Sequence, residues 1–318
     1  MRKNAAFLFV LLFCGSIVLA GADGNRKKFE LEWDGGFSLI NPEDLNLRTG
    51  FQEAYEKYWN EDFLAYALDK GYIESLDVQK LGEYKKLRRA IPLGLRLKYS
   101  LSASLAISLG LKVVSGSSFS ETFHQYICGL QGGGSITRNY SYFPLNVSAW
   151  GIAPMMGAHF SLFLNPRLQL AAYVSGGPLF GFCRQIMGKS SLESSNINPG
   201  QESYYKLEYK GSGLGMALDT GIQVRYPLRS RINVFFEGGY SFQRIKKISG
   251  TGKTDTGTSV DTWEGDWGII RYQNSGLWGT MDETYFTNSW DGREDEWIRG
   301  FVLDLSGFQV KAGLGFYF

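Results

Sequence analysis

The side chains best suited to chemistry are those of two histidines and their polar neighbours. His124 follows Ser120 and Glu121, and a hydroxyl, an imidazole and a carboxylate are the groups that nucleophilic catalysis needs. These residue types also occur together by chance in any polar segment, so we expect no catalytic site. His159 lies in an alternating apolar segment. We expect it to be packed and hydrogen-bonded inside the fold.

Tryptophan and acidic residues gather in the segment 246–297. It contains ten acidic and five basic residues, together with five of the eight tryptophans, Trp263, Trp267, Trp278, Trp290 and Trp297. Exposed tryptophan beside aspartate suits contact with sugars, including lipopolysaccharide, but a packed cluster of rings is the simpler expectation. The acids at Asp255, Asp261, Asp266 and 291–296 match no calcium-loop spacing, and we predict no metal site. No phosphate-binding or dinucleotide-binding motif occurs, so we predict no cofactor.

The composition excludes several classes of protein. The chain has 33 Lys and Arg against 31 Asp and Glu, which argues against a nucleic-acid partner bound through net charge. With 40 glycines, 8 prolines and 3 cysteines in 318 residues, it is neither collagen-like nor disulfide-dense. A folded chain rich in glycine and aromatic residues remains.

Residues 1–22 read as a cleaved signal peptide. Arg2 and Lys3 precede an apolar run from Ala5 to Ala20, and cleavage is expected after Ala20 or Ala22. Removal of the two basic residues leaves a mature chain, 23–318, with a formal net charge of zero. We therefore expect export from the cytoplasm. In an oxidising compartment Cys128 and Cys183 form either a disulfide or two unpaired buried thiols.

Alternation of apolar and other residues is the main structural signal after the signal peptide. It is clearest over 101–113, where every second residue is apolar, and it recurs in seven further segments. The eight predicted strands cover about 29–39, 91–99, 101–113, 150–162, 168–182, 214–226, 232–242 and 308–318. Short turns join alternate pairs, and long loops at 41–88, 115–141, 183–204 and 246–297 join the others. This rhythm is typical of a closed antiparallel up-and-down barrel.

The second face of these strands carries small residues and isolated charges instead of a dense cover of lysine and glutamate. Small residues suit a crowded interior, and charges there must be paired to be tolerated. We therefore predict a plugged interior with an ion-pair network made of Glu32, Asp34, Arg96, Lys98, Lys112, Asp219, Arg225, Glu237 and Lys311.

Aromatic residues on the apolar face sort into two groups, as expected for rings at two membrane interfaces. One group lies near the short turns and comprises Tyr99, Phe160, Tyr226, Phe316 and Phe318. The other lies near the long loops and comprises Trp150, Phe180, Phe182, Tyr240 and Phe242. Leu, Ile, Val and Ala fill the strands between them.

The last strand carries a specific resemblance. Phe308, Val310, Ala312, Leu314, Phe316 and Phe318 alternate up to a final Phe, which resembles the terminal assembly signal of bacterial outer-membrane barrels. With the signal peptide and the eight-strand rhythm, the mature chain is similar to small barrels of the OmpA transmembrane-domain, OmpX and OmpW kind. The resemblance implies an all-β fold in the bacterial outer membrane, outer-membrane lipids as surroundings, and recognition of the last strand by the barrel-assembly machinery. It also implies a monomer, and we expect no periplasmic domain after Phe318.

Function is therefore expected in the long loops. Residues 50–88 are predicted to be partly helical, with a helix against the barrel rim or across its mouth. A structural or surface-binding role, without enzymatic activity, is our main hypothesis. A passive transporter or porin for small or apolar solutes is the alternative, and a lipid-modifying enzyme is a weaker one. The sequence leaves open whether the segment 246–297 adds two further strands, which would make ten.

Overall fold

The computed structural model describes residues 28–58, 62–130, 136–165, 167–195, 200–274, 279–286 and 297–318. The predicted signal peptide, residues 1–22, lies outside the described residues. In the described part, no helix has the length and apolar character needed to cross a membrane.

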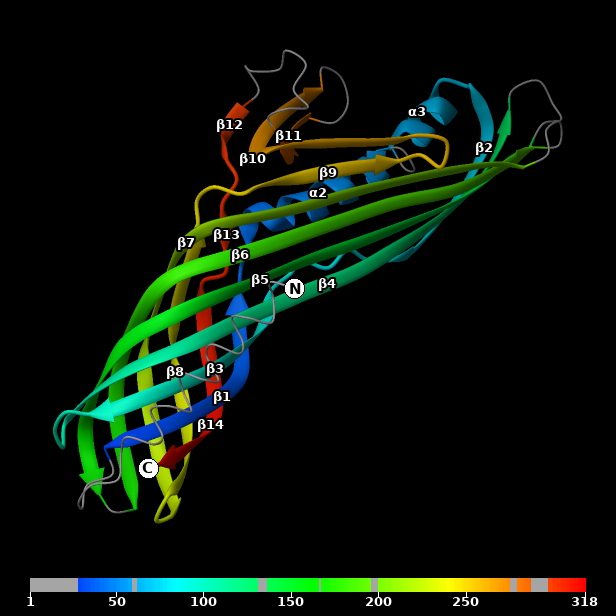
Figure 1. Cartoon of the computed structure of the whole chain (residues 1–318). Coiled ribbons are helices and arrows are strands. Elements are labelled where there is room, and N and C mark those ends of the chain that lie inside the picture. The colour runs from blue at the N-terminus through cyan, green and yellow to red at the C-terminus, as the bar shows by residue number, and fades with distance from the viewer. Residues whose placement is uncertain are drawn as a thin grey trace.

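Eight antiparallel strands form a ring in which each strand pairs with two others. Neighbouring strands around the ring are β1, β3, β4, β5, β6, β7, β8 and β14, and β14 pairs again with β1 (Figure 1). Their bounds are β1 Phe29–Ile40, β3 Arg89–Ser100, β4 Leu105–Leu130, β5 Ile136–Asn165, β6 Leu168–Ser195, β7 Gln201–Arg229, β8 Ile232–Ile245 and β14 Gly307–Tyr317. All eight predicted strands take part in this antiparallel sheet.

Two short turns explain where the strands begin and end. The third predicted strand starts at Leu105 rather than Leu101, because the Ser102 hydroxyl accepts hydrogen bonds from the backbone N–H groups of Ser104 and Leu105 and holds a turn. After β5, the side chain of Asn165 accepts a hydrogen bond of 3.0 Å from the N–H of Arg167. The predicted turn at Asn165 therefore separates β5 from β6.

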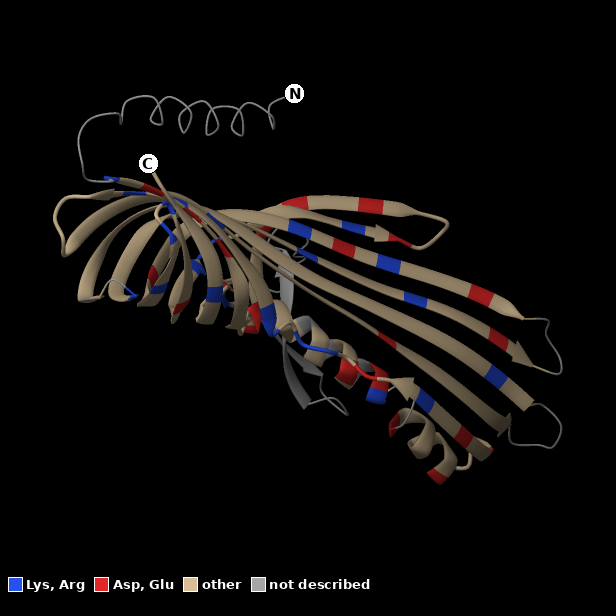
Figure 2. Cartoon of the chain, turned by 90° about the horizontal axis from the view of Figure 1, so that it is seen from below, with Lys and Arg blue, Asp and Glu red and all other residues tan. Residues whose placement is uncertain are grey.

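Two of the predicted loops are strands instead. Residues 115–130 and 136–141 extend β4 and β5, and most of 183–204 extends β6 and β7, so these four strands have 26 to 30 residues. We call this part of the sheet, beyond the ring, the extension. Figure 2 shows charged residues spaced along it. The sequence prediction was wrong here because the apolar residues of the extension, such as Phe143 and Leu145, are on the opposite face from those of the ring. On β4 the inward face is polar instead, with Ser120, Thr122 and His124.

The remaining long loops add strands to the two edges of the extension. Strand β2, Ile73–Gly82, pairs with β4, while β9, Ser249–Asp255, pairs with β7 and is followed by β10, Val260–Asn274, and β11, Gly279–Phe286. The short strands β12, Trp297–Gly300, and β13, Leu303–Asp304, pair with β10 and β8. The segment 246–297 therefore adds strands to the extension, while the ring keeps eight.

Two helices cover the inner side of the extension. Helix α2 spans Glu43–Lys57 and α3 spans Phe63–Asp69, so helix formation starts earlier and ends sooner than the predicted 50–88. Helix α2 begins with the acids Glu43 and Asp44, which favour a helix N-terminus. After α3, Gly71 has φ 73° and turns the chain into β2. The helical prediction for this loop is confirmed in part.

Candidate functional site

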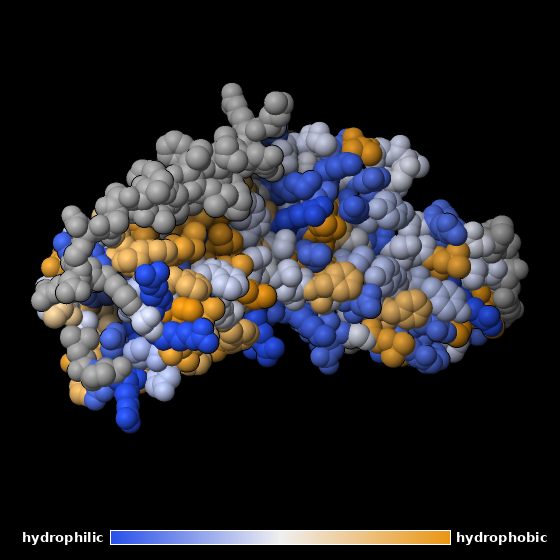
Figure 3. All heavy atoms as spheres, turned by 60° about the horizontal axis from the view of Figure 1, so that its bottom comes forward, coloured by the Kyte–Doolittle hydropathy of each residue, from blue (hydrophilic) through white to orange (hydrophobic). Residues whose placement is uncertain are grey.

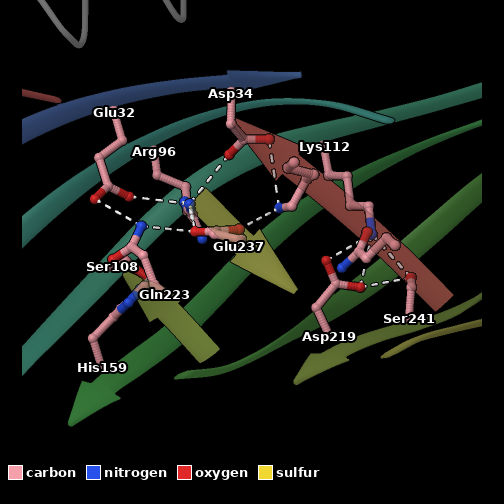
Figure 4. Close-up of polar contacts among 12 residues, drawn as sticks. Glu32, Asp34, Arg96, Ser108, Lys112, His159, Asp219, Gln223, Glu237 and Ser241 are labelled. Carbon is pink, nitrogen blue, oxygen red and sulfur yellow. Dashed lines mark hydrogen bonds and ion pairs between the residues drawn. The ribbon is translucent and has the colours of Figure 1, made fainter. Parts of the chain in front are cut away.

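The structure places all nine residues of the predicted ion-pair network inside the ring. Each of their side chains lies on the inward face of its strand, and none is more than 8% exposed. The side chains reach one another across the ring, as Figure 4 shows for its two main groups. Ion pairs and hydrogen bonds connect them.

Arg96 lies at the centre of the larger group. Its Nη2 atom is 3.1 Å from a carboxylate oxygen of both Glu32 and Asp34, and it also contacts Glu237. On the other side of these acids, Nζ of Lys311 lies 2.7 Å from Oε2 of Glu237. The guanidinium group of Arg96 thereby joins β3 to β1 and β8, and Lys311 adds β14 through the same acids.

Towards the short turns the same group continues through Lys98 and Arg225. Lys98 donates a 2.7 Å hydrogen bond to Glu32, and Arg225 donates one of 2.6 Å to Glu30. Gln223 links the two halves, since its amide donates to both Glu32 and Glu237. Our prediction omitted Glu30, although it precedes Glu32 by two residues and therefore shares its face. With Glu30 the described network has five acids and five bases.

Lys112 and Asp219 form the second group. Nζ of Lys112 lies 2.6 and 2.8 Å from the two carboxylate oxygens of Asp219, and it also donates to Ser241 and Gln309. Away from this pair, on the side of Gln223, His159 shares a 3.2 Å hydrogen bond with Ser108 through Nε2 (Figure 4). Its ring is 4% exposed, as expected for a packed histidine.

An apolar cluster closes the ring beyond these two groups. Val114 is the next inward residue after Lys112 on β4, and Ala217 is the next one before Asp219 on β7. The cluster includes the following buried residues: Val114, Ala149, Ala153, Leu179, Ala217, Ile245, Leu303 and Leu305. The interior therefore changes from charged to apolar towards the extension.

Helix α2 lies over the apolar cluster and is held at its N-terminal end. Leu45 is fully buried in the cluster. The side-chain amide of Asn46 forms a pair of hydrogen bonds with the backbone of Leu87, at 2.8 and 2.9 Å. Arg299 pairs with Asp44 through two nitrogens, and Gln185 of β6 donates to the carbonyl of Leu45. Three separate segments, around Leu87, Gln185 and Arg299, thus fix the first turn of α2.

The C-terminal end of α2 is held by a buried polar cluster around Glu56. Its Oε2 atom lies 2.8 Å from Nε2 of His124 and 2.8 Å from Oγ1 of Thr122, both on β4. Tyr84 also donates to Glu56, and Gln52 donates over 3.1 Å. The side chains of Glu56 and His124 are 0% and 1% exposed. We call this group the Glu56 cluster.

The neighbours of His124 in sequence are not its partners. Glu121 lies on the opposite, outward face of β4, where it accepts a 2.8 Å hydrogen bond from Tyr142. Ser120 shares the inward face with His124. Inward positions are two residues apart, so Thr122 lies between Ser120 and His124. His124 binds Glu56 of the distant helix instead, a contact that no sequence spacing indicates.

The two cysteines are free thiols, which agrees with the second of the two alternatives left open by the sequence. Cys128 is opposite Thr137 of β5, and Cys183 is opposite Ala149 of the same strand. The twelve residues between these positions span about 40 Å at ~3.3 Å per residue, whereas a disulfide needs Cα atoms within about 7 Å. Both thiols are buried.

The tryptophan-rich segment packs inward as far as the structure describes it. Trp267 is 1% exposed and contacts Phe301 and Tyr209 edge to face, with Trp263 against the same tyrosine. Trp278, Trp290 and the acids at 291–296 lie outside the described residues, as does the side chain of Trp297. The described residues contain no group of acids, histidines or cysteines suited to a metal ion.

The last strand presents its alternating residues on the outside of the ring. Phe308, Val310 and Phe316 are 69%, 64% and 38% exposed, and Phe318 is 42% exposed. Strand β14 pairs with β8 on one side and with β1 on the other. It therefore joins the two ends of the chain.

No family model matches the sequence, and no curated protein matches it either. Among solved structures, a major outer membrane protein from Thermus thermophilus has 10% identity and a TM-score of 0.30, over 92% of this chain and 99% of that chain. The outer membrane protease OmpT from Escherichia coli has 10% identity and a TM-score of 0.28, over 92% and 97%. The translocator domain of the autotransporter NalP from Neisseria meningitidis has 7% identity and a TM-score of 0.17, over 100% and 98%. These scores are low, and neither the fold nor the function is inferred from them.

Proposed function

We propose that the ring is a β-barrel spanning the bacterial outer membrane, and that the protein has a structural or surface-binding role exerted by the extension on the cell surface. The distribution of polarity carries this proposal. Met216, Phe308 and Trp33 point outward and are 71%, 69% and 60% exposed, while Glu32 points inward and is 0% exposed. Such an arrangement would be unfavourable in water and is favourable when hydrocarbon surrounds the ring.

The extent and borders of the apolar surface also fit a membrane. Strand β14 has 11 residues, and a spanning strand needs about 9–11. Aromatic pairs lie at both ends of the ring, with Phe29 and Tyr99 at 4.9 Å near the short turns and Trp150 stacked on Phe182 at 4.0 Å near the extension. Figure 3 shows hydrophobic residues gathered over the ring end of the molecule and a more polar surface over the extension.

The contents of the ring favour this role over passive transport. The ion-pair network crosses the interior, the apolar cluster follows it, and α2 lies over the cluster. A solute would have to break buried ion pairs and displace a helix that three segments hold. We therefore propose a plugged barrel and expect no steady single-channel conductance in planar bilayers, whereas open-channel currents would favour the porin alternative.

The proposed partners follow from the exposed surfaces. Outer-membrane lipids would surround the ring. The barrel-assembly machinery would recognise the outward residues of β14, Phe308, Val310, Ala312, Leu314 and Phe316, together with Phe318 directly after it. We propose a monomer, since the ring completes its own strand pairing. Contact of the extension with glycans or lipopolysaccharide belongs to the same proposal. We assign no enzymatic role to His124, which is buried beneath α2; an unchanged lipid A in expressing cells, with wild type or His124→Ala, is the expected result.

Cysteine labelling of intact cells tests membrane insertion and orientation together. Lys80 is exposed on β2 of the extension, and Ser102 is exposed in the turn between β3 and β4. With a membrane-impermeant maleimide, Lys80→Cys should react on intact cells and Ser102→Cys only after the outer membrane is permeabilised. Equal labelling at both sites on intact cells would contradict the proposal, as would a mature protein that stays folded and monomeric in detergent-free buffer.

A further inference from the structure

Basic side chains gather on the outside of the molecule where the ring meets the extension. We call them the basic patch: Arg184 on β6, Lys210 on β7, Arg244 at the end of β8, and Lys246 and Lys247 in the turn between β8 and β9. All five are exposed. The exposed fractions of the Lys210 and Lys247 side chains are 58% and 72%.

The fold brings these residues together from three separate parts of the chain. Arg184 is directly opposite Lys210 in the pairing of β6 with β7. Strand β8 leaves β7 at the Met216–Arg244 pair, and β9 occupies the same edge of β7 from Ser212 onward. The turn between β8 and β9 passes so close to β7 that a Cβ atom on Gly213 would lie 2.2 Å from the Lys247 carbonyl oxygen. The turn that carries Lys246 and Lys247 thus lies along the same edge of β7 as Gly213, three residues from Lys210.

The patch keeps an excess of positive charge. Glu208 is shared by two of its members, with Oε1 2.7 Å from Nε of Arg184 and 3.0 Å from Nζ of Lys210. Asp266 pairs with Lys247 at 2.8 Å. Asp304 is opposite Arg244, but its Oδ1 accepts a hydrogen bond from the N–H of Ser306.

Neither Arg244 nor Lys246 has an ion-pair partner in the described part of the chain. A fourth acid, Glu264, lies across β9 from Lys210 in the same row of the sheet. The five bases therefore exceed the four nearby acids. An anion bound at the patch would not have to displace an existing partner from either of these two side chains.

The patch borders directly on the most exposed part of the apolar wall. On β7, Leu214 and Met216 continue the outward face of Lys210 towards the ring and are 63% and 71% exposed. On β6, Phe182 precedes Arg184 by two residues, and on β8 Phe242 precedes Arg244 by two. A molecule that covers both surfaces must have anionic groups next to hydrocarbon chains.

We propose that the basic patch binds the phosphate groups of an outer-leaflet lipid whose acyl chains lie along Leu214, Met216 and Phe242. Arginine and lysine are the side chains that bind phosphate best, arginine through paired N–H groups. The position at the end of the apolar wall sets the phosphates at the level of the lipid headgroups. This inference rests on the proposed insertion of the ring in the outer membrane, with the extension on the cell surface.

Lipid binding to the refolded full-length mature protein tests the proposal. The protein in detergent micelles is titrated with diphosphorylated lipid A and with its dephosphorylated form, and bound lipid is counted by native mass spectrometry. Arg244→Gln with Lys246→Gln removes two bases without breaking an ion pair of the described structure. Each base near a lipid surface contributes to the free energy of binding. The loss of two bases should therefore weaken the binding of diphosphorylated lipid A about thirtyfold. Arg184→Gln with Lys210→Gln should have a similar effect.

A matched control separates the patch from general charge. Lys80→Gln with Arg138→Gln removes two exposed bases on the extension, far from the ring, and should leave binding unchanged. Equal losses in patch and control variants, or equal affinity for the dephosphorylated lipid, would overturn the proposal. Competition by inorganic phosphate with the same midpoint as the lipid would assign the patch to free phosphate instead and would also overturn it.

The two proposals fail in different ways. If the labelling experiment shows membrane insertion while lipid A binds wild type and patch variants alike, only the lipid site is wrong. If the protein is soluble without detergent, the membrane proposal itself is wrong.

Discussion

The ring and the extension share four long strands, β4 to β7, yet they have opposite polarity. On β5, Met156 points outward from the ring and is 68% exposed, whereas Phe143 points inward in the extension and is 3% exposed. On β7, Asp219 is buried inside the ring, and Lys210 is exposed on the outside of the extension. Side chains alternate between the two faces along the whole of β5 and β7. The apolar ones point outward in the ring and inward in the extension.

This difference shows how the surroundings of each region select its side chains. A sheet exposed to water on one side buries its apolar face against another element, which α2 provides in the extension. A strand whose outer face meets hydrocarbon needs the reverse order, with its charges paired inside. The change occurs near the Trp150 and Phe182 pair and marks the outer border of the proposed membrane region.

The largest effect is expected from removing a buried charge in the ring. Arg96→Leu leaves Glu32, Asp34 and Glu237 without their shared partner, and should lower the free energy of unfolding by about 3–5 kcal/mol. Urea unfolding of the protein refolded in lipid vesicles measures it. Arg184→Leu, which removes an exposed arginine paired with Glu208 in the extension, should cost only about 0–1 kcal/mol. Similar losses in the two variants would remove the distinction between the regions.

A smaller effect is expected from placing a charge on the outward face of β7. Leu218→Lys puts an ammonium group on the apolar wall and should destabilise the vesicle-inserted protein by about 2–4 kcal/mol. Glu202→Lys lies on the same face of the same strand in the extension, and should be near neutral. The two substitutions are compared by the same urea titration. An unaffected Leu218→Lys protein would mean that this face of the ring does not contact hydrocarbon.

The Glu56 cluster should have a local effect. Glu56→Leu leaves the polar groups of His124, Thr122 and Tyr84 without their acceptor, a loss of about 1–3 kcal/mol. Hydrogen exchange should rise along α2 while the ring strands stay protected, because the cluster contacts only the extension. Glu53→Gln, an exposed position on the same helix, serves as the control. Loss of protection throughout the ring would show that the two regions unfold as one unit.

The smallest expected effect concerns the free thiols. Burial, and secondarily Glu193, raise the pKa of the Cys128 thiol above its ordinary value, so little reactive thiolate forms at neutral pH. Cys183 is 4% exposed. Both should alkylate slowly in the folded protein and rapidly in urea, as followed by mass spectrometry. A pair that resists alkylation in urea without reductant would indicate a disulfide and contradict the structure.

The ring could be predicted from the sequence because its signal is local. Leu105 to Val113 alternate without interruption, and the same is true of β14, so each strand and its two faces are readable one at a time. The same alternation predicted the charged residues of the interior. It could also have predicted Glu30, which the prediction omitted. The extension was not predictable in this way, since a segment such as 115–130 has Phe beside Glu121 on its outward face and Ser120, Thr122 and His124 on its inward face, so that neither face is consistently apolar.

Contacts between distant segments were also beyond the sequence. Glu56 and His124 are 68 residues apart, and nothing in their spacing indicates that a helix covers this part of β4. The basic patch joins β6, β7 and the segment from the end of β8 to β9, where each segment alone contributes one to three ordinary surface bases. Which acid pairs with which base inside the ring likewise depends on strand order and stagger.

The sequence by itself determined that these strands have one apolar and one small or charged face, because side chains alternate along any extended chain. The tertiary structure decided which face is inward in the ring and in the extension, and which distant charges meet. Those features depend on the pairing of whole strands and on the helix docked beside them. They arise only when the chain closes on itself.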